Sequence, residues 1–534
     1  MRMSKEKSFW GWGYADYKVD PSRIEAFKTL MTGIANVETF SDNKEPNINA
    51  LTLRKPRFSI SDKLSSICSD DTKDRASHSF GKSFRDIWRA SKGLFDNPPD
   101  YVAYPRTEDD IHELYNFAAA RNISIIPFGG GSSVVGGIEP TLSNNYKGVI
   151  TVDLKHFNQI LEIDKKSRSA RIQAGIFGPE LERGLKQHGL TLRHFPQSFE
   201  FSTLGGWIVT RSGGHFATVY THIEEFLQSV RMVTPNGILQ SRRLPGSGAG
   251  PSEERFVAGS EGIFGIVTEA WMRLQEIPKF KSAQTVKFTS WKAAVEACRL
   301  IGQSGLNPAN TRLIDKTEAL INGLGDGQNH IVILGFESAD RDMKVYMDQA
   351  LDICRKCEGS WEIKNKSITR DSKADAWKKS FLEAPYLRDE MIRKGCILET
   401  FETSVTWDQF DTFHSEMMKR GRSAIDSICG GGIITCRFTH LYPDGPAPYY
   451  TIIAKGQTGN EIEQWDAIKK IVSDTIIELG GTITHHHAVG KDHQPFYEKQ
   501  RSDVFAESLK AVKDKLDPKW ILNPEVLITR NHST

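Results

Sequence analysis

The 534-residue sequence lacks long apolar runs, since its longest apolar stretches are short and soon interrupted by polar residues. No segment is therefore long enough to span a bilayer. The sequence also lacks an excess of charge of one sign, because 69 basic and 67 acidic side chains leave a formal net charge of +2. No run of Lys or Arg is long enough to form a basic stripe, so we expect no nucleic-acid partner.

Cysteine is scarce as well, and its count of seven is odd. Both facts argue against a disulfide framework. Cys354 and Cys357 form a lone C-x-x-C pair, which we interpret as two ordinary cysteines rather than a redox or zinc site. Met1–Tyr14 has no apolar core of a signal peptide, and the final Asn-His-Ser-Thr is not a peroxisomal address. We therefore expect a cytoplasmic protein.

The composition is that of a globular chain, with 39% apolar and 25% charged residues. Its length favours two or three domains. We expect a helical lead-in at 1–97, an α+β unit at 98–278, a second α+β domain at 279–505 and a short return segment at 506–534.

A regular alternation of elements begins after Pro98. Tyr101–Pro105 predicts a short strand, and Thr107 with Asp110 has the spacing of a helix-capping box. Ile123–Ile126 predicts a strand that leads into a triple glycine. Further strands are predicted at 148–154, 169–174, 226–234, 264–274, 330–336, 398–412, 432–442 and 449–455, and further helices at 179–190, 291–301, 339–358 and 462–479.

Three glycine-rich loops follow predicted elements: Pro127–Ser133, Pro196–Gly214 and Gly259–Gly265. Glycine permits positive φ and has no Cβ, so backbone N–H groups can approach an anion closely. The first loop alone fits a phosphate cradle and a tight structural turn equally well, and it is neither a dinucleotide fingerprint nor a Walker loop. Three such loops with Ser and Thr favour a backbone that wraps an extended polar cofactor.

In this order the three loops resemble the FAD-binding domain of the vanillyl-alcohol oxidase/p-cresol methylhydroxylase superfamily. Within it, the chain is most similar to the alkyldihydroxyacetonephosphate synthase family, from Gly11–Gly13 through Gly259–Gly262 to Asp517–Pro518. The resemblance implies an α+β fold with a PCMH-type FAD-binding domain of two subdomains and an α+β cap, or substrate, domain. It implies noncovalent FAD held by Pro127, Phe128, Gly129, Gly130, Gly131, Ser132, Ser133, Gln197, Ser198, Phe199, Glu200, Phe201, Ser202, Thr203, Thr210, Arg211, Ser212, Gly213, Ser260, Glu261, Gly262, Gly265, Ile266 and Val267.

Three adjacent histidines, His485, His486 and His487, form the most distinctive local feature. The run alone admits metal binding or a solvated loop, and no H-x-x-x-H or H-E-x-x-H motif accompanies it. The resemblance instead implies that these histidines lie at the active site beside the flavin, and we predict no bound metal.

The resemblance assigns three further residues to the site. Tyr449 matches a proton donor/acceptor, Arg388 matches an arginine that binds the substrate phosphate, and Arg312 matches another functional arginine. Without the family, Tyr449 reads equally as an interface tyrosine, and each arginine more often as a surface ion-pair partner. A guanidinium suits phosphate because it donates two parallel hydrogen bonds and keeps its charge.

The resemblance implies a transferase of ether lipid biosynthesis. It would exchange the acyl chain of acyl-dihydroxyacetone phosphate for a long-chain alcohol, through an adduct with flavin N5. The alternative is an FAD-linked oxidase or dehydrogenase of a 2-hydroxy acid or alcohol. Gln197, in place of an expected acidic residue, and the segment 211–223 resemble the oxidoreductase relatives. A lipid substrate would allow peripheral membrane contact, and a homodimer is left open.

Overall fold

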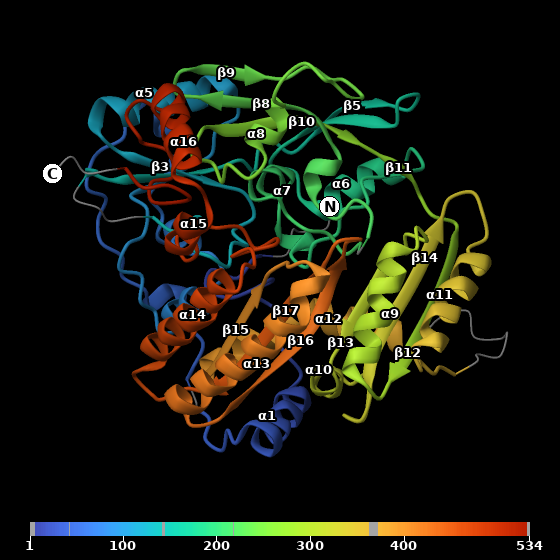
Figure 1. Cartoon of the computed structure of the whole chain (residues 1–534). Helices are drawn as coiled ribbons and strands as arrows, with labels where there is room; N and C mark the ends of the chain where they lie inside the picture. The colour runs from blue at the N-terminus through green and yellow to red at the C-terminus, as the bar shows by residue number, and fades with distance from the viewer. Residues whose placement is uncertain (1–5, 42, 141–144, 217, 363–371, 531–534) are drawn as a thin grey trace.

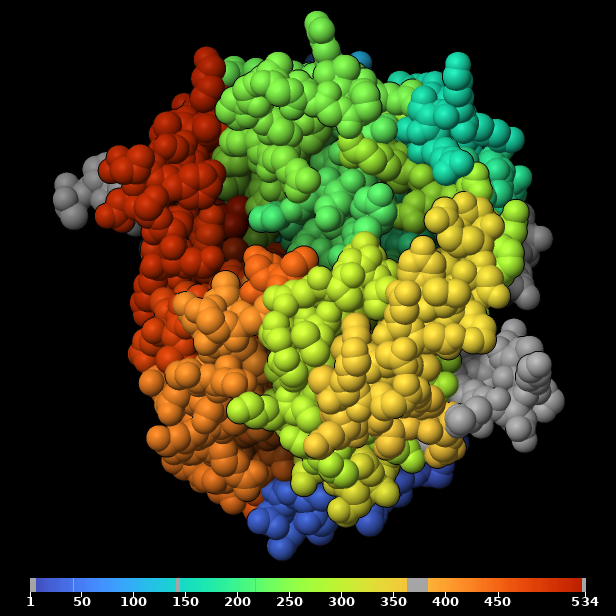
Figure 2. Space-filling model, turned by 45° about the vertical axis from the view of Figure 1, so that its right-hand side comes forward, coloured from blue at the N-terminus to red at the C-terminus, as the bar shows by residue number. Residues whose placement is uncertain are grey.

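The computed structural model describes residues 6–41, 43–140, 145–216, 218–362 and 372–530. The predicted α+β fold is confirmed. Figure 1 shows two layered halves, the upper built on a four-stranded and a five-stranded sheet and the lower on a six-stranded sheet. In Figure 2 the upper half, coloured cyan to green, rests on the yellow-green to orange lower half, and the red C-terminal segment lies along the upper half.

The four-stranded sheet has the order β1 (Cys68–Ser69), β2 (Tyr101–Ala103), β4 (Val149–Asp153) and β3 (Ser124–Phe128). β2 and β3 both run parallel to β4, so the carboxyl ends of all three meet at one edge. Helix α5 (Glu108–Arg121) links β2 to β3. Its predicted capping box is present, because Thr107 Oγ1 accepts from the Asp110 N–H and an Asp110 oxygen accepts from the Thr107 N–H. The first glycine loop leaves this edge directly after β3.

The five-stranded sheet is antiparallel, in the order β5 (Ile160–Asp164), β6 (Ser169–Gln173), β10 (Ile266–Arg273), β8 (Leu227–Thr234) and β9 (Gly237–Gln240). Its central strand β10 begins immediately after the third glycine loop. Helices α6 (Gly178–Lys186), α7 (Leu204–Thr210) and α8 (Glu253–Val257) accompany the sheet, with a small strand pair of β7 (Leu190–Thr191) and β11 (Gln275–Glu276). Helix α7 lies within the second glycine-rich segment, Pro196–Gly214.

The six-stranded sheet of the lower half is also antiparallel, in the order β12 (Phe280–Phe288), β14 (His330–Ser338), β13 (Asn310–Ile314), β16 (Gly432–Leu441), β17 (Pro446–Lys455) and β15 (Cys396–Glu402). Successive side chains of a strand point to opposite faces. Ile434 and Ile452 pack in the core of α13 (Trp407–Cys429), whereas the adjacent pair Ile433 and Ile453 packs against α1 (Pro21–Ala35). The sheet is therefore covered by helices on both faces, as Figure 1 shows.

The prediction of a strand over 398–412 is wrong in its second half. β15 ends at Glu402, and α13 begins at Trp407. Phe410, Phe413 and Met417 recur at helical spacing and are all buried, so helical periodicity governs this segment. Gly421 lets the helix approach the sheet, since a Cβ there would lie 2.7 Å from Ile434 Cδ1.

Other helices and short 3₁₀ turns complete the described chain: η1 (Ile48–Ala50), α2 (Asp62–Ser65), α3 (Thr72–Ser77), α4 (Phe84–Ser91), η2 (Phe199–Phe201), η3 (Ile223–Glu225), α9 (Trp291–Gln303), α10 (Lys316–Ile321), α11 (Lys344–Lys356), α12 (Ser372–Arg393), α14 (Glu461–Glu478), α15 (Gln494–Gln500) and α16 (Asp503–Leu516). The predicted helix at 339–358 thus begins later, at Lys344. All seven cysteines are free thiols. Among the described helices, none combines the length and the apolarity that crossing a bilayer requires.

The C-terminal segment returns to the upper half. Ile125 of β3 donates its N–H to Ile521 O at 2.7 Å, and Ile125 O accepts from the Asn523 N–H at 2.8 Å. Buried Lys513 donates to Asp517 and to the Leu522 carbonyl, which fixes this return. The proposed boundaries at 97/98, 278/279 and 505/506 stay predictions.

Candidate functional site

One cavity lies between the glycine loops of the upper half and strands β16 and β17 of the lower half. It gathers residues that are up to 511 positions apart in the chain, from Trp12 to Asn523 on its wall. The predicted site residues that line it are Pro127, Phe128, Gly129, Gly130, Gly131, Ser132, Ser133, Gln197, Ser198, Ser202, Thr203, Thr210, Ser212, Gly213, Glu261, Gly262, Gly265, Ile266, Val267, Arg312, Arg388, Tyr449, His486 and His487.

A smaller set of predicted residues does not line the cavity: Phe199, Glu200, Phe201, Arg211, Ser260 and His485. All but Glu200 are adjacent in sequence to one that does, and Glu200 is two residues from both Ser198 and Ser202. Phe201 is buried, and Arg211 forms an ion pair with buried Glu224 at 2.6 Å. Phe201 and Arg211 therefore support the glycine loops from outside the cavity. His485 does not line the cavity itself, but its ring is hydrogen-bonded to that of His486, which does.

Close backbone packing joins the first two glycine loops. A Cβ on Gly130 would lie 1.9 Å from Phe201 O and 2.6 Å from Ser202 Cα. In the third loop Gly262 has φ +76°, and a Cβ there would lie 2.9 Å from Pro127 of the first loop. Only glycine satisfies these contacts, because any Cβ would separate the loops. The result is a continuous backbone cradle with the hydroxyls of Ser132, Ser133 and Ser202 at its wall, which fits the pyrophosphate and ribityl chain of FAD.

Glu261 connects the third glycine loop to the segment after the histidine run. Its two carboxylate oxygens accept the N–H groups of Val489 and Gly490, each at 2.8 Å. Its carbonyl accepts from Asn523 Nδ2 at 2.7 Å. Burial raises the pKa of Glu261 to about 7, against the opposing effect of the two N–H groups. Glu261 therefore holds the segment after the histidine run and the C-terminal return against the third glycine loop.

Glu402, the last residue of β15, positions the histidine run. Its carboxylate accepts the backbone N–H groups of His485, His486 (3.1 Å) and His487 (2.8 Å), and the Thr484 hydroxyl at 2.7 Å. Burial alone would raise the pKa of Glu402, but the neighbouring histidines and the Thr484 hydroxyl outweigh it and lower that pKa far below its ordinary value. An ionised carboxylate thus holds the three consecutive residues in a tight turn.

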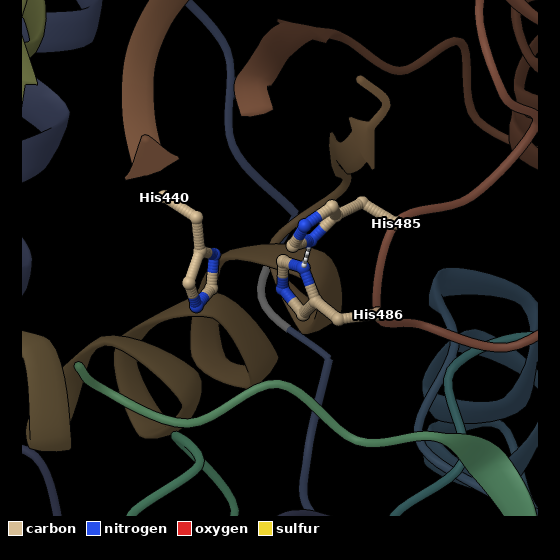
Figure 3. A group of neighbouring side chains, drawn as sticks. All are labelled: His440, His485 and His486. Atoms are coloured by element: carbon tan, nitrogen blue, oxygen red, sulfur yellow. Dashed lines mark hydrogen bonds between the residues drawn. The ribbon is translucent and has the colours of Figure 1, made fainter. Parts of the chain in front are cut away.

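The three histidines are neutral near pH 7. Burial lowers the pKa of each, to about 3 for His486, and Glu402 opposes the fall. Nearby histidines add to the lowering for His485 and His486, whereas Lys469 and Arg437 add to it for His487. Figure 3 shows His485 and His486 joined by a hydrogen bond between their Nδ1 atoms, 3.0 Å long, with His440 of β16 facing them. One ring nitrogen from each lies within 4.8 Å of the others, a group that could hold a metal ion. In this structure hydrogen bonds join the rings to one another and to neighbouring groups.

Tyr449 lies directly opposite Arg437 on the paired strands β16 and β17. The Arg437 guanidinium carbon is 3.8 Å from the centre of the Tyr449 ring. Arg437 is itself held by an ion pair with buried Glu318 at 2.5 Å. Burial raises the pKa of Tyr449, while Arg437 opposes the rise. The phenol is thus protonated at neutral pH and has a cation against its ring.

The two predicted arginines occupy different walls. Arg312 of β13 is buried and donates to His215 Nδ1 at 3.0 Å. Burial and Arg437 lower the pKa of Arg312 to about 9, which leaves it a cation at pH 7. Arg388 of α12 donates from Nε and Nη2 to Asp389 Oδ1. The other Asp389 oxygen accepts the Trp12 N–H at 2.6 Å, so the N-terminal segment closes this side of the cavity.

Sequence reasoning missed several residues of the site. Glu318 and His440 carry no local motif, and their roles appear only when β16 and α10 come together. Glu402 lies in Phe401–Ser404, a segment that resembles the family's substrate domain, but no role was predicted for it. None was predicted for Arg437 or Tyr442 either. Counting residues from the turn would not have paired Arg437 with Tyr449, because a register shift between Phe438 and His440 offsets the two strands by one residue.

The cavity, its glycine cradle and its cap define an FAD-linked flavoenzyme. A model described as "FAD binding domain" matches residues 99–241, and one described as "FAD linked oxidases, C-terminal domain" matches residues 277–527. An alkyldihydroxyacetonephosphate synthase of Dictyostelium discoideum is 31% identical over 489 residues, covering 86% of this chain and 78% of the relative. The chain belongs to the alkyldihydroxyacetonephosphate synthase family, and FAD is its cofactor.

Other comparisons agree with this assignment. A solved alkyldihydroxyacetonephosphate synthase superposes with a TM-score of 0.81 at 26% identity and covers 97% of this chain and 98% of its own. p-Cresol methylhydroxylase shares the fold, with a TM-score of 0.67 at 14% identity over 96% of this chain and 98% of its own. A glycolate oxidase subunit of Bacillus subtilis is 26% identical and covers 82% of this chain and 90% of the relative. The predicted PCMH-type fold is confirmed.

Proposed function

We propose that this enzyme exchanges the acyl chain of acyl-dihydroxyacetone phosphate for a long-chain alcohol, with no net oxidation. The observation that carries the proposal is the convergence of the Tyr449 phenol, the neutral imidazoles of His486 and His487, and three guanidiniums on the cavity that the FAD loops line. An oxidation of an alcohol needs a base and a hydride acceptor. The exchange also needs an acid for the leaving carboxylate and a cation for a phosphate, and this cavity offers both.

The side chains divide these tasks by their chemistry. Arg388 binds the substrate phosphate, since its guanidinium donates two hydrogen bonds in a fixed geometry. His486 is a neutral imidazole and accepts the proton that the substrate loses. Tyr449 keeps its proton at neutral pH and donates it to the departing carboxylate, and later accepts one from the incoming alcohol. Bound FAD supplies the ring that activates the reacting carbon.

The remaining residues position these groups. Glu402 fixes the histidine run through three N–H groups, and Glu318 orients Arg437 against Tyr449. Arg312 adds a second buried cation to the wall, which suits a substrate that carries two negative charges. A long-chain lipid substrate further implies peripheral contact with a membrane surface.

The test is ether synthesis without oxygen. Purified enzyme with acyl-dihydroxyacetone phosphate and hexadecanol should form the ether product and release fatty acid in equal amounts, with no electron acceptor present. Tyr449→Phe should retain FAD and lose turnover by roughly 10²–10⁴, the range of a general acid/base. Tyr346→Phe, on α11 away from the cavity, is the matched control.

The second candidate is a flavin oxidase or dehydrogenase of a 2-hydroxy acid. It is favoured by the similarity to a glycolate oxidase subunit and by Gln197 on the cavity wall. Hydrogen peroxide or reduced acceptor formed in step with a carbonyl product, without any ether, would establish it and contradict the exchange reaction.

A further inference from the structure

A continuous line of hydrogen bonds leads from the cavity wall to His222, which lies outside the cavity. His486 Nδ1 lies 3.0 Å from His485 Nδ1, and His485 Nε2 lies 2.7 Å from the Tyr442 hydroxyl. That hydroxyl lies 3.1 Å from Thr221 Oγ1, which in turn lies 3.1 Å from His222 Nδ1. His486 lines the cavity, whereas His222 at the far end does not, and both side chains are partly buried. Figure 3 shows the first link of the line.

The position of each proton along the line can be deduced from its far end. His222 Nε2 faces the carbonyl oxygen of His485 at 2.9 Å, and a carbonyl only accepts, so Nε2 carries the proton. In a neutral ring Nδ1 is then an acceptor, and the Thr221 hydroxyl donates to it. The Tyr442 hydroxyl donates to Thr221 Oγ1 and accepts from His485 Nε2. Each assignment follows from the one before it.

The proton positions on His485 and His486, at the cavity end, agree with this direction of hydrogen bonding. With its proton on Nε2, neutral His485 accepts at Nδ1, so His486 carries its proton on Nδ1. The carboxylate of Glu402 lies 3.7 Å from His486 Nδ1 and favours a proton there. His486 Nε2 is therefore the unprotonated nitrogen, as a general base requires.

We propose that Tyr442, Thr221 and His222 form a proton relay that serves His486, an inference that rests on the proposed exchange reaction. The substrate proton binds His486 Nε2, and the His486 Nδ1 proton moves to His485 Nδ1. The His485 Nε2 proton moves to the Tyr442 oxygen, the Tyr442 proton moves to Thr221, and the Thr221 proton moves to His222 Nδ1. Every intermediate group keeps its proton count, and only His222 gains a charge. Product protonation runs the same steps in reverse.

The surroundings explain why the charge ends at His222. Burial lowers the pKa of His485 and His486, so a cation on either is unfavourable and the proton passes through them. His222 lies outside the cavity and beside Glu225, whose carboxylate accepts the His222 backbone N–H at 3.0 Å and is a second acceptor for the Thr221 hydroxyl at 3.4 Å. This carboxylate favours a positive charge on the neighbouring imidazole. Tyr442, Thr221 and His222 act through His486 and are positioning residues.

The experiment removes one hydroxyl from the middle of the line. Tyr442→Phe should retain FAD and the KM for the acyl substrate, while kcat for ether synthesis falls at least roughly tenfold, less than on removal of the base itself. In mixtures of H₂O and D₂O, wild-type kcat should vary along a curve, because several protons move together. In Tyr442→Phe it should vary linearly. His222→Gln should also lose activity, because the line then ends at a side chain that cannot gain a proton.

Tyr450→Phe is the matched control, because it also removes one buried hydroxyl, which contacts His414 outside the line. The relay is overturned if Tyr442→Phe keeps the wild-type kcat and isotope dependence, if Tyr450→Phe shows the same changes, or if activity requires a metal bound to His440, His485 and His486. Nitrogen-15 NMR of histidine-labelled holoenzyme gives a readout that needs no turnover. It should find His485 protonated on Nε2 and His486 on Nδ1, and the opposite tautomers would overturn the relay even if the exchange reaction itself is absent.

Discussion

The guanidinium of Arg437 lies 3.8 Å from the ring centre of Tyr449, its cross-strand partner on β16 and β17. A cation against a phenol ring opposes the rise in the pKa of Tyr449 that burial causes. The pair therefore adjusts how readily Tyr449 releases its proton in a buried site.

Arg437→Gln should raise the pKa of Tyr449 further, because the opposing charge is lost. Proton donation by the phenol becomes harder, so kcat should fall roughly 10-fold or more, with the KM for the acyl substrate much less affected. Ultraviolet difference titration of the tyrosines and steady-state kinetics measure both effects. Arg422→Gln, a half-exposed cation on α13, is the control and should change neither.

Glu402→Gln should destabilise the histidine run, because the amide nitrogen of Gln is a donor. It would face a backbone N–H that the Glu402 carboxylate accepts in the wild type. The expected loss is about 1–3 kcal/mol for each buried donor left unpaired. The folded-state pKa of Glu402 is lowered, so its contribution to stability is complete above the unfolded pKa, near 4.5, and is lost as pH falls. The difference in unfolding free energy between variant and wild type should therefore be constant from pH 6 to 8 and shrink below about pH 4.5. A difference that grows with acidity would contradict this.

Arg388→Lys should weaken substrate binding, since one ammonium cannot reproduce two parallel guanidinium hydrogen bonds. We expect a loss of about 2–5 kcal/mol in kcat/KM for the phosphate substrate. Unchanged kcat/KM in both Arg388→Lys and Arg388→Ala would contradict the assignment of phosphate binding to Arg388. Arg420→Lys, on the exposed side of α13, serves as the control.

FAD should be noncovalent, so acid precipitation should release all yellow colour into the supernatant. Gly130→Val should abolish FAD uptake, because a side chain there meets Phe201 O and Ser202 Cα and forces the first two loops apart. Gly246→Val is the matched control, since a Cβ at Gly246 meets no atom within 4 Å. Flavin absorbance per polypeptide distinguishes the two variants, and colour retained in the precipitate would contradict the noncovalent assignment.

The sequence alone predicted the elements whose signals are local. The capping box at Thr107 and Asp110, the strand before Pro127 and the amphipathic helix after Ile462 all depend on residues within a few positions of one another. The three glycine loops were recognisable for the same reason, because the glycines that the backbone requires stand next to one another in the sequence. The start of α13 was missed because Phe401–Thr403 continues a strand pattern up to the turn, although Phe410, Phe413 and Met417 beyond it recur at helical spacing.

Tertiary structure alone decided which side chains share the cavity. Glu402 and His487 are 85 positions apart, and Arg437 and Glu318 are 119 apart, yet each pair is in direct contact. Tyr442 and His222 enter one hydrogen-bond line only because β16 ends beside the loop before η3. The amino-acid sequence determined the FAD cradle and the family, since backbone conformation is encoded locally. The protonation states and the order of the proton transfers depend on burial and on partners from distant segments, so only the folded chain could define them.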